Sequence, residues 1–140
     1  MYSDSRVNRD YVRSVGELLG SQKNLGIVVG GGNPARDAAN AVRLRKGGEF
    51  AADEAAIEVT RKNARLLAKA IGVRHAVFCK DFDSTARVFG KKIPVMGGVL
   101  PGLTTDAVAV LLAEKLGVGV VVNASKINGV YDKNPSVYSE

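Results

Sequence analysis

The stretch IPVMGGVLPGLTTDAVAVLLAEKLG, residues 93–117, decides the fold class. It opens with an apolar run whose length and composition are typical of a buried strand. Gly97 and Gly98 end the run, a Pro-Gly turn follows, and an apolar segment with helical spacing begins at Thr104. A buried strand that passes through a glycine-rich loop into a helix is the unit from which parallel α/β sheets are built.

The same alternation of apolar strands and amphipathic helices runs through the rest of the chain. It predicts helices at 8–19, 37–45, 52–71, 83–88 and 104–116, and strands at 25–29, 75–79, 92–97 and 118–125. In the longest helix the candidate buried positions are Ala56, Val59, Ala64, Leu67 and Ile71. The expected fold class is therefore α/β, with a mostly parallel sheet covered by helices on both faces.

Length and composition indicate one globular domain over residues 1–140. No apolar run approaches the roughly 20 residues that a membrane helix needs, so no membrane association is expected. The first residues, MYSDSRVNRDYVRS, are polar and of mixed charge, unlike a secretory signal. The single cysteine, Cys79, lies in an apolar run and is expected to be a buried thiol. These features point to a reducing, cytoplasmic location.

The charge and the histidine content limit which kinds of ligand are expected. The chain carries 20 Lys and Arg against 14 Asp and Glu, a formal net charge of +6. The basic residues are scattered and not interleaved with aromatic residues, so nucleic acid is not an expected partner. Phosphorylated small molecules remain compatible with the charge. His75 is the single histidine, and no Cys/His cluster could hold zinc, so no protein-bound metal is expected.

Three loops follow predicted strands, at 30–36, 97–106 and 123–135. Because ligands of open α/β sheets bind beyond the carboxyl ends of the strands, these loops are expected to open on one edge. In the first loop, glycine N–H groups and Arg36 could bind an anion, or the loop could be a tight strand-to-helix turn. The third loop contains Tyr131, which could pack beside a base, and a plain surface loop is the alternative.

The second loop places Thr104, Thr105 and Asp106 where a helix begins. Threonine hydroxyls at a helix N-terminus can bond phosphate oxygens, and the helix dipole favours negative charge there. The same residue types are also ordinary helix N-caps. Asp106 would repel a phosphate, so we expect it to cap the helix or to orient a neighbouring group.

Taken together, these segments resemble a known family. VVGGGNPAR, EVTRKNARLLAKAI, IPVMGGVLPGLTTDAVAVLLAEKL and NGVYDKNP are similar to the archaeal-type uridylate kinases of the amino-acid kinase family. The resemblance covers nearly the whole chain and is most specific in the Gly-Gly, Pro-Gly and Thr-Thr-Asp-Ala stretch. It implies a three-layer α/β/α sandwich and transfer of the γ-phosphoryl of ATP to UMP, with Mg²⁺, in pyrimidine nucleotide biosynthesis. It also implies a homo-oligomer based on dimers, a hexamer in the family, with helix 52–71 at the dimer interface.

The resemblance assigns roles by position and leaves the catalytic residue unknown. Asp53 corresponds to an aspartate that receives the ribose hydroxyls of UMP, which a carboxylate accepts well. The implied UMP-binding residues are Gly31, Asp53, Val99, Leu100, Pro101, Gly102, Leu103, Thr104 and Thr105. The implied ATP-binding residues are Gly32, Arg36, Ser125, Tyr131 and Asn134.

The chain also departs from the family pattern. The family begins with a strand ending in Gly-Gly-Ser and continues beyond GVYDKDP, so the chain is expected to be truncated at both ends. Little kinase activity is then expected from these residues alone. Leu100 and Leu103 replace two histidines of the pattern, Ser125 replaces a threonine and Asn134 an aspartate.

Two other functions stay open on the sequence. One is a different kinase on the same scaffold, with a carboxylate or a phosphate monoester as acceptor. The other is a non-catalytic nucleotide-binding or storage subunit.

Overall fold

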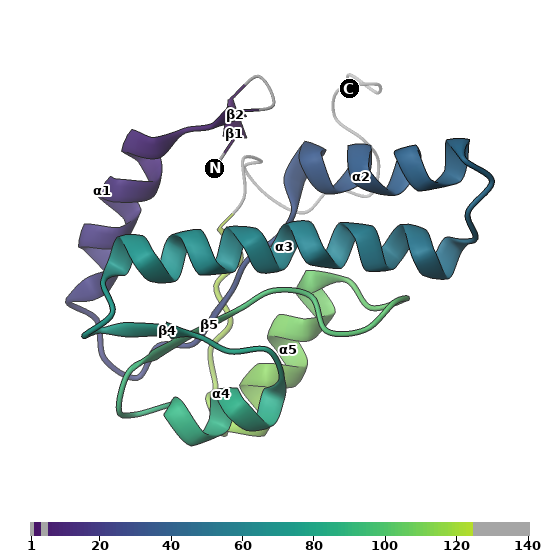
Figure 1. The fold of residues 1–140 in the computed structure, drawn as a ribbon. Helices are drawn as coiled ribbons and strands as arrows, with labels where there is room; N and C mark the ends of the chain where they lie inside the picture. The colour runs from purple at the N-terminus through teal and green to yellow at the C-terminus, as the bar shows by residue number, and fades with distance from the viewer. Residues whose placement is uncertain (1, 4–5, 125–140) are drawn as a thin grey trace, which may run out of the picture.

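The computed structural model describes residues 2–3 and 6–124. A short antiparallel ribbon, β1 (Tyr2–Ser3) and β2 (Arg6–Val7), precedes the main body. The elements that follow are α1 (Arg9–Gly20), β3 (Ile27–Val28), α2 (Gly32–Leu44), α3 (Glu49–Ile71), β4 (Ala76–Phe78), α4 (Phe82–Val88), β5 (Ile93–Met96) and α5 (Thr105–Leu116). Figure 1 shows the long α3 crossing the molecule above the strands.

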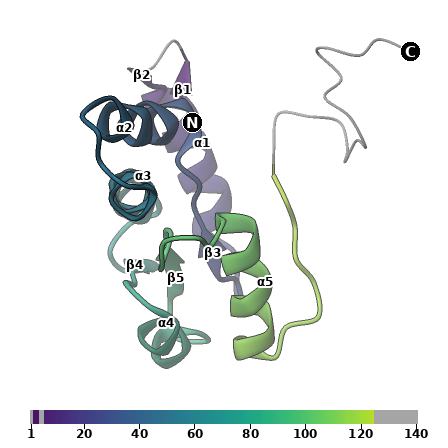
Figure 2. The same ribbon diagram turned by 90° about the vertical axis from the view of Figure 1, so that its right-hand side faces the viewer.

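The main sheet has the order β3-β5-β4, and both strand pairs are parallel. Side chains alternate between its two faces, as a strand requires. Ile27 and Val95 join a core cluster with α1 and α3, whereas Val28 and Met96 join a second cluster with α4 and α5. Helices therefore cover both faces of the sheet, and α2 packs against α3 beyond it (Figure 2). The expected α/β/α layering is confirmed.

All five predicted helices form, but α2, α3 and α4 begin earlier than predicted, α4 by a single residue. Helix α2 begins at Gly32 rather than at residue 37, because Pro34 lies in its first turn, where a missing N–H costs no helical bond. In α3, Ala64, Leu67 and Ile71 are buried as predicted, whereas Ala56 and Val59 are half-buried. Thr60 and Asn63 occupy buried positions instead.

The predicted strand at 118–125 is wrong for the part that the structure describes. Residues 118–124 form no strand, and Val120, Val121 and Val122 are 77%, 49% and 81% exposed. Figure 2 shows this segment running apart from the three strands of the main sheet. A β-branched composition makes a strand only where a neighbour supplies ladder hydrogen bonds, and no described strand pairs with this segment.

Two further expectations concern single side chains. Cys79 is buried, as predicted, and burial raises the pKa of its thiol. His75 is exposed at the start of β4. None of the helices in the described ranges is both long enough and apolar enough to span a bilayer.

Helix α4 is held at its start by a capping box. The Asp81 carboxylate accepts from the Ser84 N–H at 2.7 Å, while the Ser84 hydroxyl accepts from the Asp81 N–H at 3.2 Å. The backbone bond from Ser84 is the main cause that lowers the pKa of Asp81. The stabilisation that the ionised Asp81 carboxylate contributes is therefore present above its unfolded-state pKa. It is lost as pH falls through the lower folded-state pKa.

We expect Asp81→Ala to lower the melting temperature by a few degrees at pH 7, because it removes this cap. The difference from wild type should shrink as pH falls below about 4 and through the lowered pKa of the folded-state carboxylate, because the protonated side chain no longer supplies the ionised cap. Thermal unfolding by circular dichroism between pH 7 and pH 3 measures both effects. A constant difference across that range would contradict the assignment of the cap to the ionised carboxylate.

Candidate functional site

The loops after β3 and β5 lie side by side because their strands are neighbours in the sheet. The Val29 N–H, one residue past the end of β3, donates at 2.8 Å to the carbonyl of Met96, the last residue of β5. A Cβ placed on Gly30 would lie 3.5 Å from Thr105 Oγ1. The glycine-rich start of α2 and the threonines that start α5 therefore meet at one edge, as the sequence predicted.

A cavity of about 350 Å³ opens at this edge. That volume is within the range of small-molecule sites. Its walls come from both loops and from one face of α3. The lining residues are Gly31, Asp53, Ala56, Ile57, Thr60, Gly98, Leu100, Gly102, Leu103, Thr104 and Thr105. Asp53 and three threonines thus line an otherwise mostly apolar chamber.

The structure brings most of the predicted UMP-binding residues to this cavity: Gly31, Asp53, Leu100, Gly102, Leu103, Thr104 and Thr105. Val99 and Pro101 belong to the same loop but are not among the residues that line it. On the predicted ATP side, Gly32 begins α2 and the exposed Arg36 donates to Asn33 Oδ1 at 2.9 Å. Ser125, Tyr131 and Asn134 lie outside the described residues. The ligand assigned to each residue stays a prediction.

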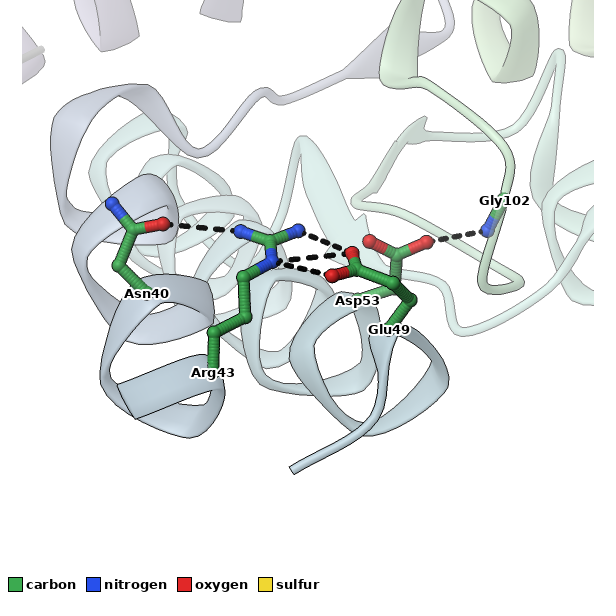
Figure 3. Close-up of polar contacts among 5 residues, drawn as sticks. All are labelled: Asn40, Arg43, Glu49, Asp53 and Gly102. Carbon is green, nitrogen blue, oxygen red and sulfur yellow. Dashed lines mark hydrogen bonds and ion pairs between the residues drawn. The ribbon is translucent and has the colours of Figure 1, made fainter. Parts of the chain in front are cut away.

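Asp53 links α3 to the loop after β5. Gly102 donates its N–H to Asp53 Oδ2 at 2.7 Å, as Figure 3 shows. Gly102 has φ +80°, and the Leu103 N–H donates to the Leu100 carbonyl at 3.2 Å, so Pro101-Gly102 forms a type II turn. Among the described residues no other hydrogen bond reaches the Asp53 carboxylate, which leaves its Oδ1 available to a ligand.

An ion pair beside Asp53 joins α2 to α3. Arg43 donates to both carboxylate oxygens of Glu49, with the shortest contact 2.6 Å from Nη2 to Oε2, and to Asn40 Oδ1 at 3.1 Å (Figure 3). The hydrogen bond from Arg43 lowers the pKa of Glu49, and the same bond raises the pKa of Arg43. Exposed ion pairs add little stability, so the effect of the Arg43–Glu49 pair is to orient the corner between α2 and α3.

Thr104 is the N-cap of α5. Its Oγ1 accepts from the Ala107 N–H at 3.2 Å. Asp106 lies in the first turn and is exposed, so the expectation that it caps the helix is wrong. The cap is Thr104, two residues before Asp106, because the N-cap is the last residue with extended backbone and Thr104 has that conformation. Thr104 and Thr105 both line the cavity, so the positive end of the α5 dipole lies at its wall.

Three polar residues of α3 that the sequence did not single out hold the two loops. Thr60 Oγ1 accepts from the Gly98 N–H at 2.7 Å, and Arg61 Nε donates to the Gly98 carbonyl at 3.2 Å. Asn63 Nδ2 donates to the Gly30 carbonyl at 2.9 Å. The sequence did offer a signal for two of them, because Thr60 and Asn63 lie on the apolar stripe of a predicted helix. Buried polar groups need hydrogen-bond partners, so such residues indicate a contact with another segment.

Comparisons with known proteins agree with this geometry. The sequence matches the amino acid kinase family over residues 2–140. It is 45% identical over 127 residues to the uridylate kinase of Methanoregula boonei, covering 89% of this chain and 54% of that protein. It is 38% identical over 139 residues to the uridylate kinase of Haloquadratum walsbyi, covering 98% of this chain and 58% of that protein.

The fold gives the same result. It resembles the crystal structure of uridylate kinase from Archaeoglobus fulgidus with a TM-score of 0.77 and 34% sequence identity, over 94% of this chain and 61% of that one. The chain thus spans little more than half the length of the relatives that it matches. The match to the family model over residues 2–140, together with this likeness in fold, shows that the chain belongs to the amino acid kinase family.

Proposed function

We propose that the protein is a uridylate kinase and that the cavity between α3 and the two loops binds UMP. The observation that carries the proposal is the convergence of Gly31, Asp53 and Thr105, from three separate elements, on one chamber. The names and the fold of the relatives support the same substrate.

The chamber suits a nucleoside monophosphate. Asp53 is its single charged lining residue and can accept hydroxyl hydrogens through Oδ1, as a ribose requires. Leu100 and Leu103 supply apolar surface against which a pyrimidine ring can pack. The cavity volume of about 350 Å³ is enough for part of a nucleotide and leaves its phosphate toward the rim.

The phosphate of UMP would lie toward the threonines. No lysine or arginine is among the lining residues, so negative charge there would be met by the N-terminus of α5 and by the hydroxyls of Thr104 and Thr105. We place ATP on the side of Gly32 and Arg36, where the N-terminus of α2 offers a second set of N–H groups. The two phosphate sites would then face each other across Gly31.

The reaction needs positioning and charge stabilisation more than a protein nucleophile. A phosphate oxygen of UMP forms a bond to the γ-phosphorus of ATP, the bond from that phosphorus to the β,γ-bridging oxygen breaks, and UDP and ADP result. The described residues contain no group of three His, Cys, Asp or Glu side chains that could hold a metal. The Mg²⁺ is accordingly proposed to enter with the phosphates of ATP as part of that substrate.

The remaining features of the proposal rest on the sequence resemblance to the family. A uridylate kinase would act in pyrimidine nucleotide biosynthesis, in the cytoplasm, and as an assembly of dimers. Sedimentation velocity of the purified protein measures the last of these.

We expect UMP to bind and carboxylate acceptors not to bind, because such acceptors lack the ribose hydroxyls that Asp53 is proposed to accept. Calorimetry with each ligand, followed by a coupled assay of ADP release from ATP and UMP, measures binding and turnover separately. Because little kinase activity is expected from these residues alone, binding of UMP without turnover would be compatible with that expectation as well as with a non-catalytic nucleotide-binding subunit. Phosphorylation of a carboxylate acceptor in place of UMP would instead identify another kinase of the family.

A further inference from the structure

The loop that lines the cavity is attached to α3 at its start. Thr60 is 6% exposed, and its Oγ1 donates to the Ile57 carbonyl at 2.7 Å while accepting from the Gly98 N–H at 2.7 Å. The adjacent Arg61 donates from Nε to the Gly98 carbonyl at 3.2 Å and from Nη2 to the Val99 carbonyl at 3.3 Å. Three backbone groups of Gly98 and Val99 are therefore fixed by two neighbouring side chains.

The attachment is tight because glycine lets the loop approach the helix closely. A Cβ on Gly98 would lie 3.0 Å from Ile57 Cγ1 and 3.3 Å from Thr60 Oγ1. Gly98 is buried, so its N–H has no access to water and depends on Thr60 for a partner. Gly98 itself lines the cavity, and the other lining residues of this loop follow it along the chain: Leu100, Gly102, Leu103, Thr104 and Thr105.

We propose that Thr60 is a positioning residue for the acceptor nucleotide. Its hydroxyl fixes the loop from Gly98 onward, and this sets where the Pro101-Gly102 turn and the start of α5 stand opposite Asp53. Arg61 reinforces the attachment from the carbonyl side. The inference rests on the proposed function for the identity of the ligand, but the anchoring of the loop can be measured without any ligand.

The test compares Thr60→Val with Thr85→Val. Valine keeps the branched shape and removes the hydroxyl, which would leave the Gly98 N–H buried without a partner. Thr85 is the matched control: it is fully buried in α4, its Oγ1 donates to the Asp81 carbonyl at 2.8 Å, and it does not line the cavity. Thr60→Ser, which keeps the hydroxyl, is the rescue variant.

We expect Thr60→Val to weaken UMP binding roughly ten-fold, the effect of losing one buried hydrogen bond, while Thr60→Ser stays within about three-fold of wild type. Thr85→Val should lower the melting temperature but leave the Kd of UMP unchanged. Hydrogen exchange of the segment 97–103, measured without ligand, should speed up about ten-fold in Thr60→Val only.

The outcomes separate the two proposals. Faster exchange in Thr60→Val, with no UMP binding by wild type, would support the anchoring and overturn the substrate. Unchanged exchange in Thr60→Val would overturn the positioning role, whatever UMP does. Equal weakening of UMP binding by Thr60→Val and Thr85→Val would also overturn it, since a general loss of stability would then explain the effect.

Discussion

Gly97→Ala is expected to lower the melting temperature by roughly 10 °C, because it forces the end of β5 away from α3. A Cβ at this position would lie 2.6 Å from Thr60 Oγ1, 2.7 Å from the Arg61 backbone nitrogen and 2.7 Å from the Thr60 carbonyl carbon. Two of these atoms are helix backbone and cannot rotate away. Overpacking a buried site costs about 1–3 kcal/mol, and a clash with backbone belongs at the upper end.

Gly119→Ala is the matched control for this prediction. A Cβ there would meet no atom within 4 Å, and Gly119 does not have a positive φ. Differential scanning calorimetry of both variants and wild type measures the effect. A Gly97→Ala protein as stable as the Gly119→Ala protein would show that α3 and β5 do not approach as closely as the structure has them.

Asp53→Asn is expected to raise the Kd of UMP about 10- to 100-fold, as the loss of a charged hydrogen-bond acceptor predicts. The carboxylate accepts the Gly102 N–H at 2.7 Å through one oxygen and would accept a ribose hydroxyl through the other. An asparagine that keeps the Gly102 bond through its oxygen turns its amide nitrogen to the ribose hydroxyl, which must then accept a neutral hydrogen bond in place of donating to a carboxylate. Stability should change little, because Asp53 is only half-buried.

Glu54→Gln is the control for charge alone. Glu54 is the next residue on α3 and is exposed, and it does not line the cavity. Isothermal titration with UMP, beside thermal unfolding of each variant, separates binding from folding. Wild-type affinity in Asp53→Asn would remove Asp53 from the nucleotide site, and equal losses in both variants would point to the overall charge of the surface.

Much of the fold could be predicted from local pattern. Apolar spacing located every helix of the main body, and β-branched runs located β3, β4 and β5, because these signals lie within a few residues of one another. The start of α2 was predicted five residues too late, because Pro34 was taken for a loop residue although it lies in the first turn of that helix. The ribbon of β1 and β2 had no sequence signal strong enough to predict it.

The candidate site was predictable in composition and not in geometry. Asp53 and Thr105 are far apart in sequence, and their meeting could be inferred only from the rule that strand ends share an edge and from resemblance to a family. The strand predicted at Val120–Val122 was wrong for a different reason. Their composition suits a strand, but a strand requires a partner, and pairing is a property of the whole sheet.

By itself, the sequence determined the helices, the three strands of the main sheet and the loops that carry glycine and threonine, and its resemblance to a family assigned one carboxylate to them. Only the tertiary structure decided that Thr60 and Arg61 hold the backbone of the loop after β5, and that Gly97 must lack a side chain. The physical reason is distance. Periodicity and capping act within one or two turns of chain, whereas a buried N–H finds its partner some 38 residues away, where only packing brings it.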